Sequence, residues 1–205
     1  MSSVAEAGVT TIKYIVDLGI MGKGPLSSAK VLAAEYRKDP TFRTQGEQAD
    51  ALIKWESAKS FAGGFTTGVG GPLAIPGAVL TSWIISARMS AAIAELYGHD
   101  AEEDRVQTFI LLMMVGDSAK EILRAAGVAV AKDLALKAIE KIPGKMLIEI
   151  NKAIGIRLLA KQGEKAHIVL VKLVPLVSGV VSGTIDAASC KAVGKAAKAA
   201  FAQSA

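Results

Sequence analysis

The sequence predicts an all-α protein, a compact multi-helix bundle with a buried Gly/Pro-rich helical hairpin. Three observations lead to this fold class. Apolar residues recur at helical spacing, and no long stretch alternates apolar and polar residues as a half-buried strand does. Hydrophobic residues make up 51% of the chain but aromatic residues only 5%, so small and aliphatic side chains dominate the helix contacts. Six glycines and two prolines lie in one uncharged segment, Phe61–Ala87. At 205 residues, we expect one helical domain, 1–205.

The first two helices are separated by a glycine-rich turn. Residues 4–20 form a weakly amphipathic pattern that ends near the Gly-Lys-Gly-Pro sequence at 22–25. Ser27 or Ser28 is expected to cap a short second helix that reaches residue 36, because a serine hydroxyl accepts from the unpaired N–H groups of a first turn. An Asp-Pro pair then stops this helix.

The third helix has a capping-box signature. Thr44 is followed three residues later by Glu47, so each side chain is expected to bond the backbone N–H of the other residue. The helix is predicted to run to about residue 61. The glycine stretch at 63–71 then breaks regular structure.

The helix predicted over 76–97 is apolar on nearly every side. Its polar stripe is narrow and consists of Thr81, Arg88 and Glu95, each seven residues apart. A helix of this kind is expected to be buried among neighbours. Arg88 has two interpretations: a buried cation that meets an anionic ligand headgroup, or the partner of a carboxylate on a neighbouring helix. The second is favoured, since buried charges are usually paired.

The remaining helices follow from capping signals and periodicity. Asp100 is expected to cap the next helix, whose acidic first turn is favourable at the positive end of the helix dipole. The expected helices cover 100–126, 128–142, 143–161 and 168–201, the last interrupted around Pro175 and Ser178.

The uncharged segment Phe61–Ala87 is too interrupted for a regular membrane span. A spanning helix needs about 20 apolar residues, whereas the run from Pro76 to Ala87, just before Arg88, has only 12 positions. The glycines before Pro76 would leave backbone groups without partners in lipid. We therefore interpret the segment as a buried helical hairpin or a shallow lipid-inserting element.

Charge is unevenly distributed along the chain. Residues 1–118 carry 10 Lys/Arg and 13 Asp/Glu, whereas residues 119–205 carry 14 Lys/Arg and 6 Asp/Glu. The basic half is mainly lysine without interleaved aromatic residues, so an anionic lipid surface is favoured over nucleic acid. Lys191, Lys195 and Lys198 share one helix face and are the predicted membrane-surface residues, although an ordinary solvated helix gives the same pattern.

Motifs of catalysis and metal binding are absent from the sequence. His99 and His167 have no second histidine at ligand spacing, and Cys190 is the single cysteine, which is typical of a reducing, cytoplasmic compartment. The sequence contains neither a Walker A motif nor G-x-S-x-G. No signal peptide is recognised. We predict no catalytic residue, metal or cofactor.

Three segments in order resemble the EcsC family of bacterial proteins. They are GFTTGVGG at 64–71, AELYGHD at 94–100 and LVPLVSGVVSG at 173–183, and the resemblance covers about 55–201. The chain has Ser178 and Asp186 where the family pattern has glycine and asparagine. The family has no established reaction or catalytic residues, so the resemblance implies no site. Its namesake is encoded beside an ABC transporter, which implies membrane-linked work.

The leading hypothesis is a non-catalytic function. The protein would bind a hydrophobic or amphiphilic, lipid-like ligand, or attach reversibly to the inner face of the membrane. The predicted ligand-binding residues are Gly68, Gly70, Gly71, Thr81, Arg88 and Met113. Two alternatives stay open. One is a hydrolase of a lipid or peptide substrate, with Ser178 or Asp117 acting beside a histidine. The other is a self-assembling protein that forms homo-oligomers.

Overall fold

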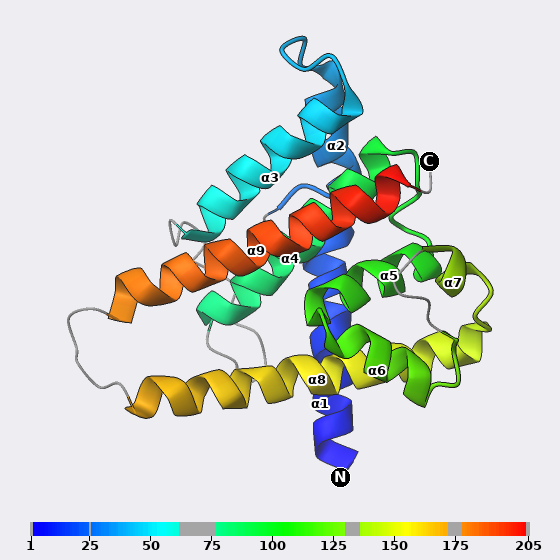
Figure 1. Ribbon diagram of the computed structural model, residues 1–205, viewed down its shortest axis with the longest axis vertical. Helices are drawn as coiled ribbons and strands as arrows, with labels where there is room; N and C mark the ends of the chain where they lie inside the picture. Colours follow the sequence, from blue (N-terminus) through cyan, green and yellow to red (C-terminus); the bar gives the residue numbers. More distant parts are fainter. Residues whose placement is uncertain (1, 25, 62–76, 130–135, 172–177, 204–205) are drawn as a thin grey trace.

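The described part of the chain is helical throughout its regular structure. The computed structural model describes residues 2–24, 26–61, 77–129, 136–171 and 178–203, with side chains for 4–24, 26–58, 79–129, 136–161 and 188–203 (Figure 1). Its helices are α1 (Ser2–Ile15), the π-helix η1 (Val16–Ile20), α2 (Ala29–Lys38), α3 (Gln45–Phe61), α4 (Gly77–Leu96), α5 (Asp104–Val115), α6 (Ser118–Ala125), α7 (Leu136–Glu140), α8 (Gly144–Val171) and α9 (Ser178–Ala202). The predicted all-α bundle is confirmed. The glycine-rich part of the predicted hairpin lies outside the described residues.

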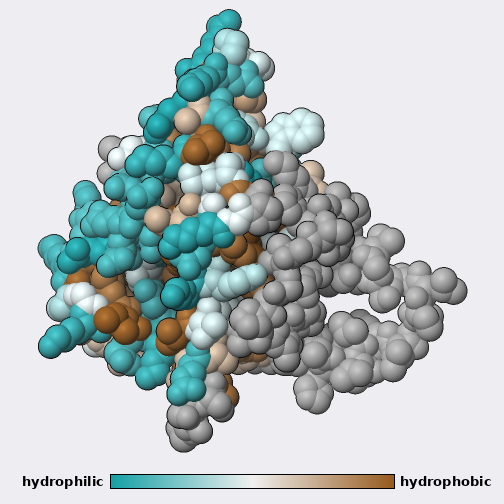
Figure 2. All heavy atoms as spheres, turned by 180° about the vertical axis from the view of Figure 1, so that it is seen from behind, coloured by the Kyte–Doolittle hydropathy of each residue, from teal (hydrophilic) through white to brown (hydrophobic). Residues whose placement is uncertain are grey.

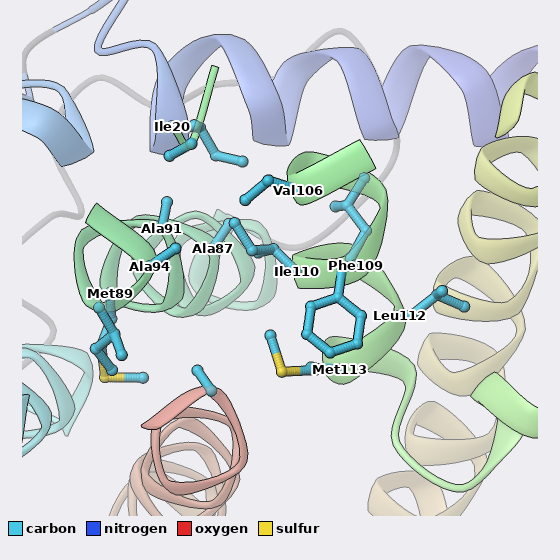
Figure 3. Close-up of a cluster of buried hydrophobic side chains, with 14 of the residues drawn as sticks. Ile20, Ala87, Met89, Ala91, Ala94, Val106, Phe109, Ile110, Leu112 and Met113 are labelled. Carbon is cyan, nitrogen blue, oxygen red and sulfur yellow. The ribbon is translucent and has the colours of Figure 1, made fainter. Parts of the chain in front are cut away.

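Helix α4 is the axis of the bundle. Helices α1, α2, α3, α5, α9 and η1 all contact it. Every residue from Ile84 to Leu96 is buried, as the apolar pattern predicts. In Figure 3, which shows α4 nearly end-on, Ile20 of η1 and Ile110 of α5 lie on different sides of it. The alanines and serines of α4 allow neighbours to approach on all sides, which explains why a single helix has so many partners.

Three glycines mark the closest helix contacts. A Cβ added to Gly194 of α9 would lie 2.8 Å from both Ile53 of α3 and Met89 of α4. One added to Gly19 of η1 would lie 2.8 Å from the carbonyl oxygen of Ile84. At the crossing of α1 and α8, a Cβ on Gly155 would overlap the backbone of Gly8. At these three glycines, the helix backbone therefore lies directly against atoms of the neighbouring helix, and an added methyl group would not fit.

The predicted helix starts at Ser28 and Thr44 are confirmed. Ser28 Oγ accepts a hydrogen bond from the Val31 amide at 3.3 Å and caps α2. Before α3, the Glu47 amide donates to Thr44 Oγ1, and the Thr44 amide donates to Glu47 Oε2, both at 3.2 Å. This is the reciprocal pair of a capping box.

The single helix predicted from Asp100 to residue 126 is wrong. Helix α5 begins at Asp104 instead, because the Asp100 carboxylate accepts from the Glu102 amide at 3.0 Å and closes a turn. Gly116 then adopts φ +62° and ends α5, so α6 is a separate helix. Glycine adopts a positive φ without the strain that a Cβ would cause, and the apolar periodicity that runs through residue 116 did not reveal the break.

The boundaries in the second half also differ from the prediction. Of the helix predicted over 128–142, α7 forms only Leu136–Glu140, Val128 and Ala129 are not helical, and 130–135 lie outside the described residues. Helix α8 continues past residue 161 to Val171, so residues 168–171 belong to it and not to the last helix. Helix α9 begins at Ser178, where the sequence suggested an interruption.

Two basic residues of α8 form hydrogen bonds to the segment between α5 and α6. Lys161 Nζ donates to the Val115 carbonyl oxygen at 2.6 Å, at the negative end of the α5 dipole. One turn earlier, Arg157 Nε donates to Ser118 Oγ at 2.8 Å, at the start of α6. Part of the basic character of the second half therefore serves the fold.

Candidate functional site

Arg88 of α4 is buried in an ion pair with Glu56 of α3. Their side chains are 8% and 1% exposed, and Arg88 Nη1 lies 3.3 Å from Glu56 Oε2. Arg88 Nε donates to the Ser27 carbonyl oxygen at 2.9 Å, and Nη2 donates to Ser27 Oγ at 2.7 Å. Each guanidinium nitrogen therefore has an acceptor, as a buried cation requires.

This geometry confirms the interpretation that Arg88 pairs with a carboxylate on a neighbouring helix. An anionic headgroup would have to displace Glu56 or Ser27 to reach the guanidinium. Displacing Glu56 would leave a carboxylate buried without its cation, which is strongly unfavourable.

Tyr36 of α2 lies near the same pair. Burial raises the pKa of its phenol, and the carboxylates of Glu56 and Glu35 raise it further, while Arg88 lowers it. Folding thus favours the neutral phenol. The associated stability is complete below the ordinary value of 10.0 and is lost as the pH rises through the raised pKa.

Of the predicted ligand-binding residues, the structure describes Thr81, Arg88 and Met113, which have different surroundings. Thr81 is half-buried on α4, and the guanidinium of Arg88 contacts Ser27, before α2, and Glu56 of α3. Met113 is buried on α5, where Figure 3 shows it beside Phe109. Phe109 makes an edge-to-face contact with Phe201 of α9, with ring centroids 5.5 Å apart. The predicted residues Gly68, Gly70 and Gly71 lie outside the described residues.

The three predicted membrane-surface lysines have different environments. Lys191 and Lys195 are exposed on α9. Lys198 Nζ lies 2.6 Å from Asp50 Oδ1 of α3, so this lysine already has an anionic partner. The lysine face of α9 therefore runs along the outer edge of α3.

Helix α3 contributes an exposed tryptophan that the sequence interpretation missed. Trp55 is 55% exposed, and Lys54 Nζ lies 5.5 Å from the centroid of its ring. Its position was readable from helical angles. Ala49, Leu52 and Ile53 define the buried face of α3, and residue 55 lies off this stripe.

Of the residues of the hydrolase alternative, the structure describes the side chains of His99 and Asp117, which lie beyond opposite ends of α5. His99 lies in the turn between α4 and α5, with its ring centroid 5.2 Å from that of Phe201. Asp117 is exposed at the start of α6. The side chains of Ser178 and His167 lie outside the described ones. Within the described residues, no group of three or more His, Cys, Asp or Glu side chains is arranged to hold a metal ion.

Among the described residues, one helix is long and apolar enough to cross a membrane. It is α4 over Val79–Leu96, and 78% of this window is buried inside the protein. The central helix of a globular bundle has the same length and composition, and the contacts of α4 give it that role here.

Hydrophobic residues are scattered on the face turned away from the viewer in Figure 1. Over the described residues, Figure 2 shows this face as mostly hydrophilic, with separate hydrophobic spots. The large hydrophobic side chains exposed in the described part are Val4, Val9, Val31, Trp55, Ile148 and Ile156. Isolated aliphatic residues of this kind are normal on protein surfaces.

Comparisons with known proteins found no match to this chain. No protein-family model, curated protein or solved structure matches the chain. The resemblance to the EcsC family therefore stays a prediction.

Proposed function

We propose that the protein has a non-catalytic role as a peripheral membrane-binding protein that attaches to the inner, cytoplasmic surface. The observation that carries this proposal is the exposed Trp55 beside Lys54 on the outer side of α3. Tryptophan is enriched where an apolar ring meets lipid and its N–H meets water. A neighbouring ammonium group adds attraction to anionic headgroups.

The surface of α3 supports membrane attachment better than the interior supports a bound lipid. The cation expected to meet an internal headgroup, Arg88, is occupied by Glu56 and Ser27. Trp55 has more than half of its surface available to a partner. The membrane-linked work that the EcsC resemblance implies agrees with this proposal.

Vesicle co-sedimentation tests the proposal. The purified chain is mixed with vesicles of phosphatidylglycerol and phosphatidylcholine in equal parts, and with vesicles of phosphatidylcholine alone. We expect the protein to sediment with the first and to stay in solution with the second. A chain that remains in solution with both, while its circular dichroism shows a folded helical protein, contradicts the proposal.

A further inference from the structure

Two oxygens of one residue, Ser27, bind one edge of the Arg88 guanidinium. Nε donates to the Ser27 carbonyl oxygen at 2.9 Å, and Nη2 donates to Ser27 Oγ at 2.7 Å. The N–H groups on this edge of an arginine point in parallel and match the paired oxygens of a carboxylate or a phosphate. Ser27 therefore lies where two oxygens of an anion would bind.

The two partners of Arg88 differ in their access to water. The Glu56 side chain is 1% exposed and meets Nη1, whereas Ser27 is exposed in the segment before α2. If Glu56 left, its carboxylate would stay buried without a cation. If Ser27 left, its carbonyl and hydroxyl groups would bond to water instead, at little cost. Ser27 is therefore the partner that a ligand can replace.

Replacing Ser27 by an anion gains electrostatic energy. An anion attracts the guanidinium by its charge, which the neutral oxygens of Ser27 lack. The Arg88 side chain is 8% exposed, so salt screens this attraction less than at the surface. Helix α2 begins two residues after Ser27, and its positive end and the exposed Lys30 of its first turn add to the attraction. Glu56 opposes it because it already neutralises Arg88, so we expect weak and reversible binding.

A phosphate fits this edge of Arg88 better than a carboxylate. It offers two oxygens to Nε and Nη2 and keeps further oxygens for the start of α2 and for water, whereas a carboxylate has only two oxygens in all. We infer that a phosphate group, from a soluble compound or from a lipid headgroup, displaces Ser27 and binds Nε and Nη2 of Arg88 while Glu56 stays in place. Because Ser27 is exposed, the rest of the ligand stays outside the bundle. This inference does not depend on the proposed membrane attachment.

Titration with inorganic phosphate tests the site. Calorimetry compares wild type with Ser27→Ala, in sodium phosphate and in sodium chloride of equal ionic strength. Ser27→Ala removes one competing hydrogen bond, so it should bind phosphate about fivefold more tightly than wild type. Ser189→Ala, which changes an exposed serine of α9, is the matched control and should bind like wild type. Equal phosphate affinities of Ser27→Ala and wild type, or no phosphate binding by either, overturn the inference.

Ser27→Asp should have the opposite effect to Ser27→Ala. A carboxylate tethered at this position stays beside Arg88 and competes with the ligand, so phosphate should bind more weakly than to wild type. If Ser27→Asp binds phosphate as tightly as Ser27→Ala, the edge of Arg88 is not the binding site.

A neutral pair in the core tests the role of Arg88 itself. Arg88→Gln with Glu56→Gln removes both charges together, so neither charge is left buried alone. Circular dichroism checks that this double variant is folded. The folded variant should lose phosphate binding, and binding equal to that of wild type contradicts the inference. If the variant does not fold, the opposite effects of the two Ser27 variants still decide.

Vesicles and a soluble phosphate ester identify the source of the phosphate. Phosphatidylcholine vesicles that contain phosphatidic acid present a phosphate monoester on a lipid, and glycerol 3-phosphate presents the same group in solution. If Ser27→Ala gains more affinity for the vesicles, the ligand is a lipid headgroup. If it gains as much or more for glycerol 3-phosphate, the ligand is soluble, and either result supports the site. Wild type that binds no anionic vesicle overturns the proposed membrane attachment, whereas the titration with free phosphate decides the site.

Discussion

Arg88 of α4 is buried, whereas Lys191 and Lys195 of α9 are exposed. Arg88 is buried, and each of its guanidinium nitrogens meets an acceptor from α3 or from the segment before α2. Lys191 and Lys195 are exposed to solvent. A buried cation must be satisfied inside the protein, whereas an exposed one is free to attract a partner. We therefore expect Arg88 to contribute to stability, and Lys191 and Lys195 to contribute to binding.

The largest expected effect comes from breaking the buried pair. Glu56→Ala should lower the free energy of unfolding by about 3–5 kcal/mol, because it leaves Arg88 buried without its carboxylate. Urea unfolding measures this change. Adding Arg88→Met to Glu56→Ala should recover part of the loss. If the single variant is as stable as wild type, the pair does not stabilise the bundle.

A smaller effect tests whether close packing extends beyond α4. Gly155→Ala should destabilise the protein by about 1–3 kcal/mol, because the added methyl overlaps the backbone of Gly8. Gly144→Ala at the start of the same helix is the matched control, since a Cβ there meets nothing within 4 Å. Thermal unfolding of both variants compares them. Equal stabilities would mean that α1 moves away from α8 at little cost.

A third change separates structural lysines from interacting ones. Lys161→Met removes the hydrogen bond to the Val115 carbonyl oxygen and should lower the free energy of unfolding by about 1 kcal/mol. Lys195→Met, on the exposed side of α9, should leave stability unchanged and weaken vesicle binding. Urea unfolding and vesicle co-sedimentation of the two variants test this division. If Lys195→Met lowers stability and Lys161→Met weakens vesicle binding, this division is wrong.

A small effect on stability is expected at the exposed pair of Asp50 and Lys198. Asp50→Asn removes the partner of Lys198 and should change the free energy of unfolding by less than about 1 kcal/mol, because water screens this pair. The same change removes one negative charge beside Lys198 of α9, so anionic vesicles should bind more tightly. Weaker vesicle binding by this variant would contradict that expectation.

The sequence predicted the helix positions of individual described residues, but not the contacts that they make. Helical angle alone placed Arg88 on a buried helix and Lys191 on a lysine face, and both placements hold in the structure. That Glu56 pairs with Arg88 was not readable, since 32 residues separate the two along the chain. The exposure of Trp55 was readable from the buried stripe of α3.

The sequence by itself determined the helical class, the burial of α4 and the capped starts at Ser28 and Thr44. These features depend on neighbours within a few turns, so periodicity and capping chemistry suffice. The tertiary structure alone decided which charges are paired, because ion pairs and helix contacts join segments far apart in the chain. It also brought Ile53 and Asp50 of α3 against Gly194 and Lys198 of α9. Helix packing, which a local pattern does not encode, therefore decides that Arg88 is paired inside the protein while Lys191 and Lys195 are exposed.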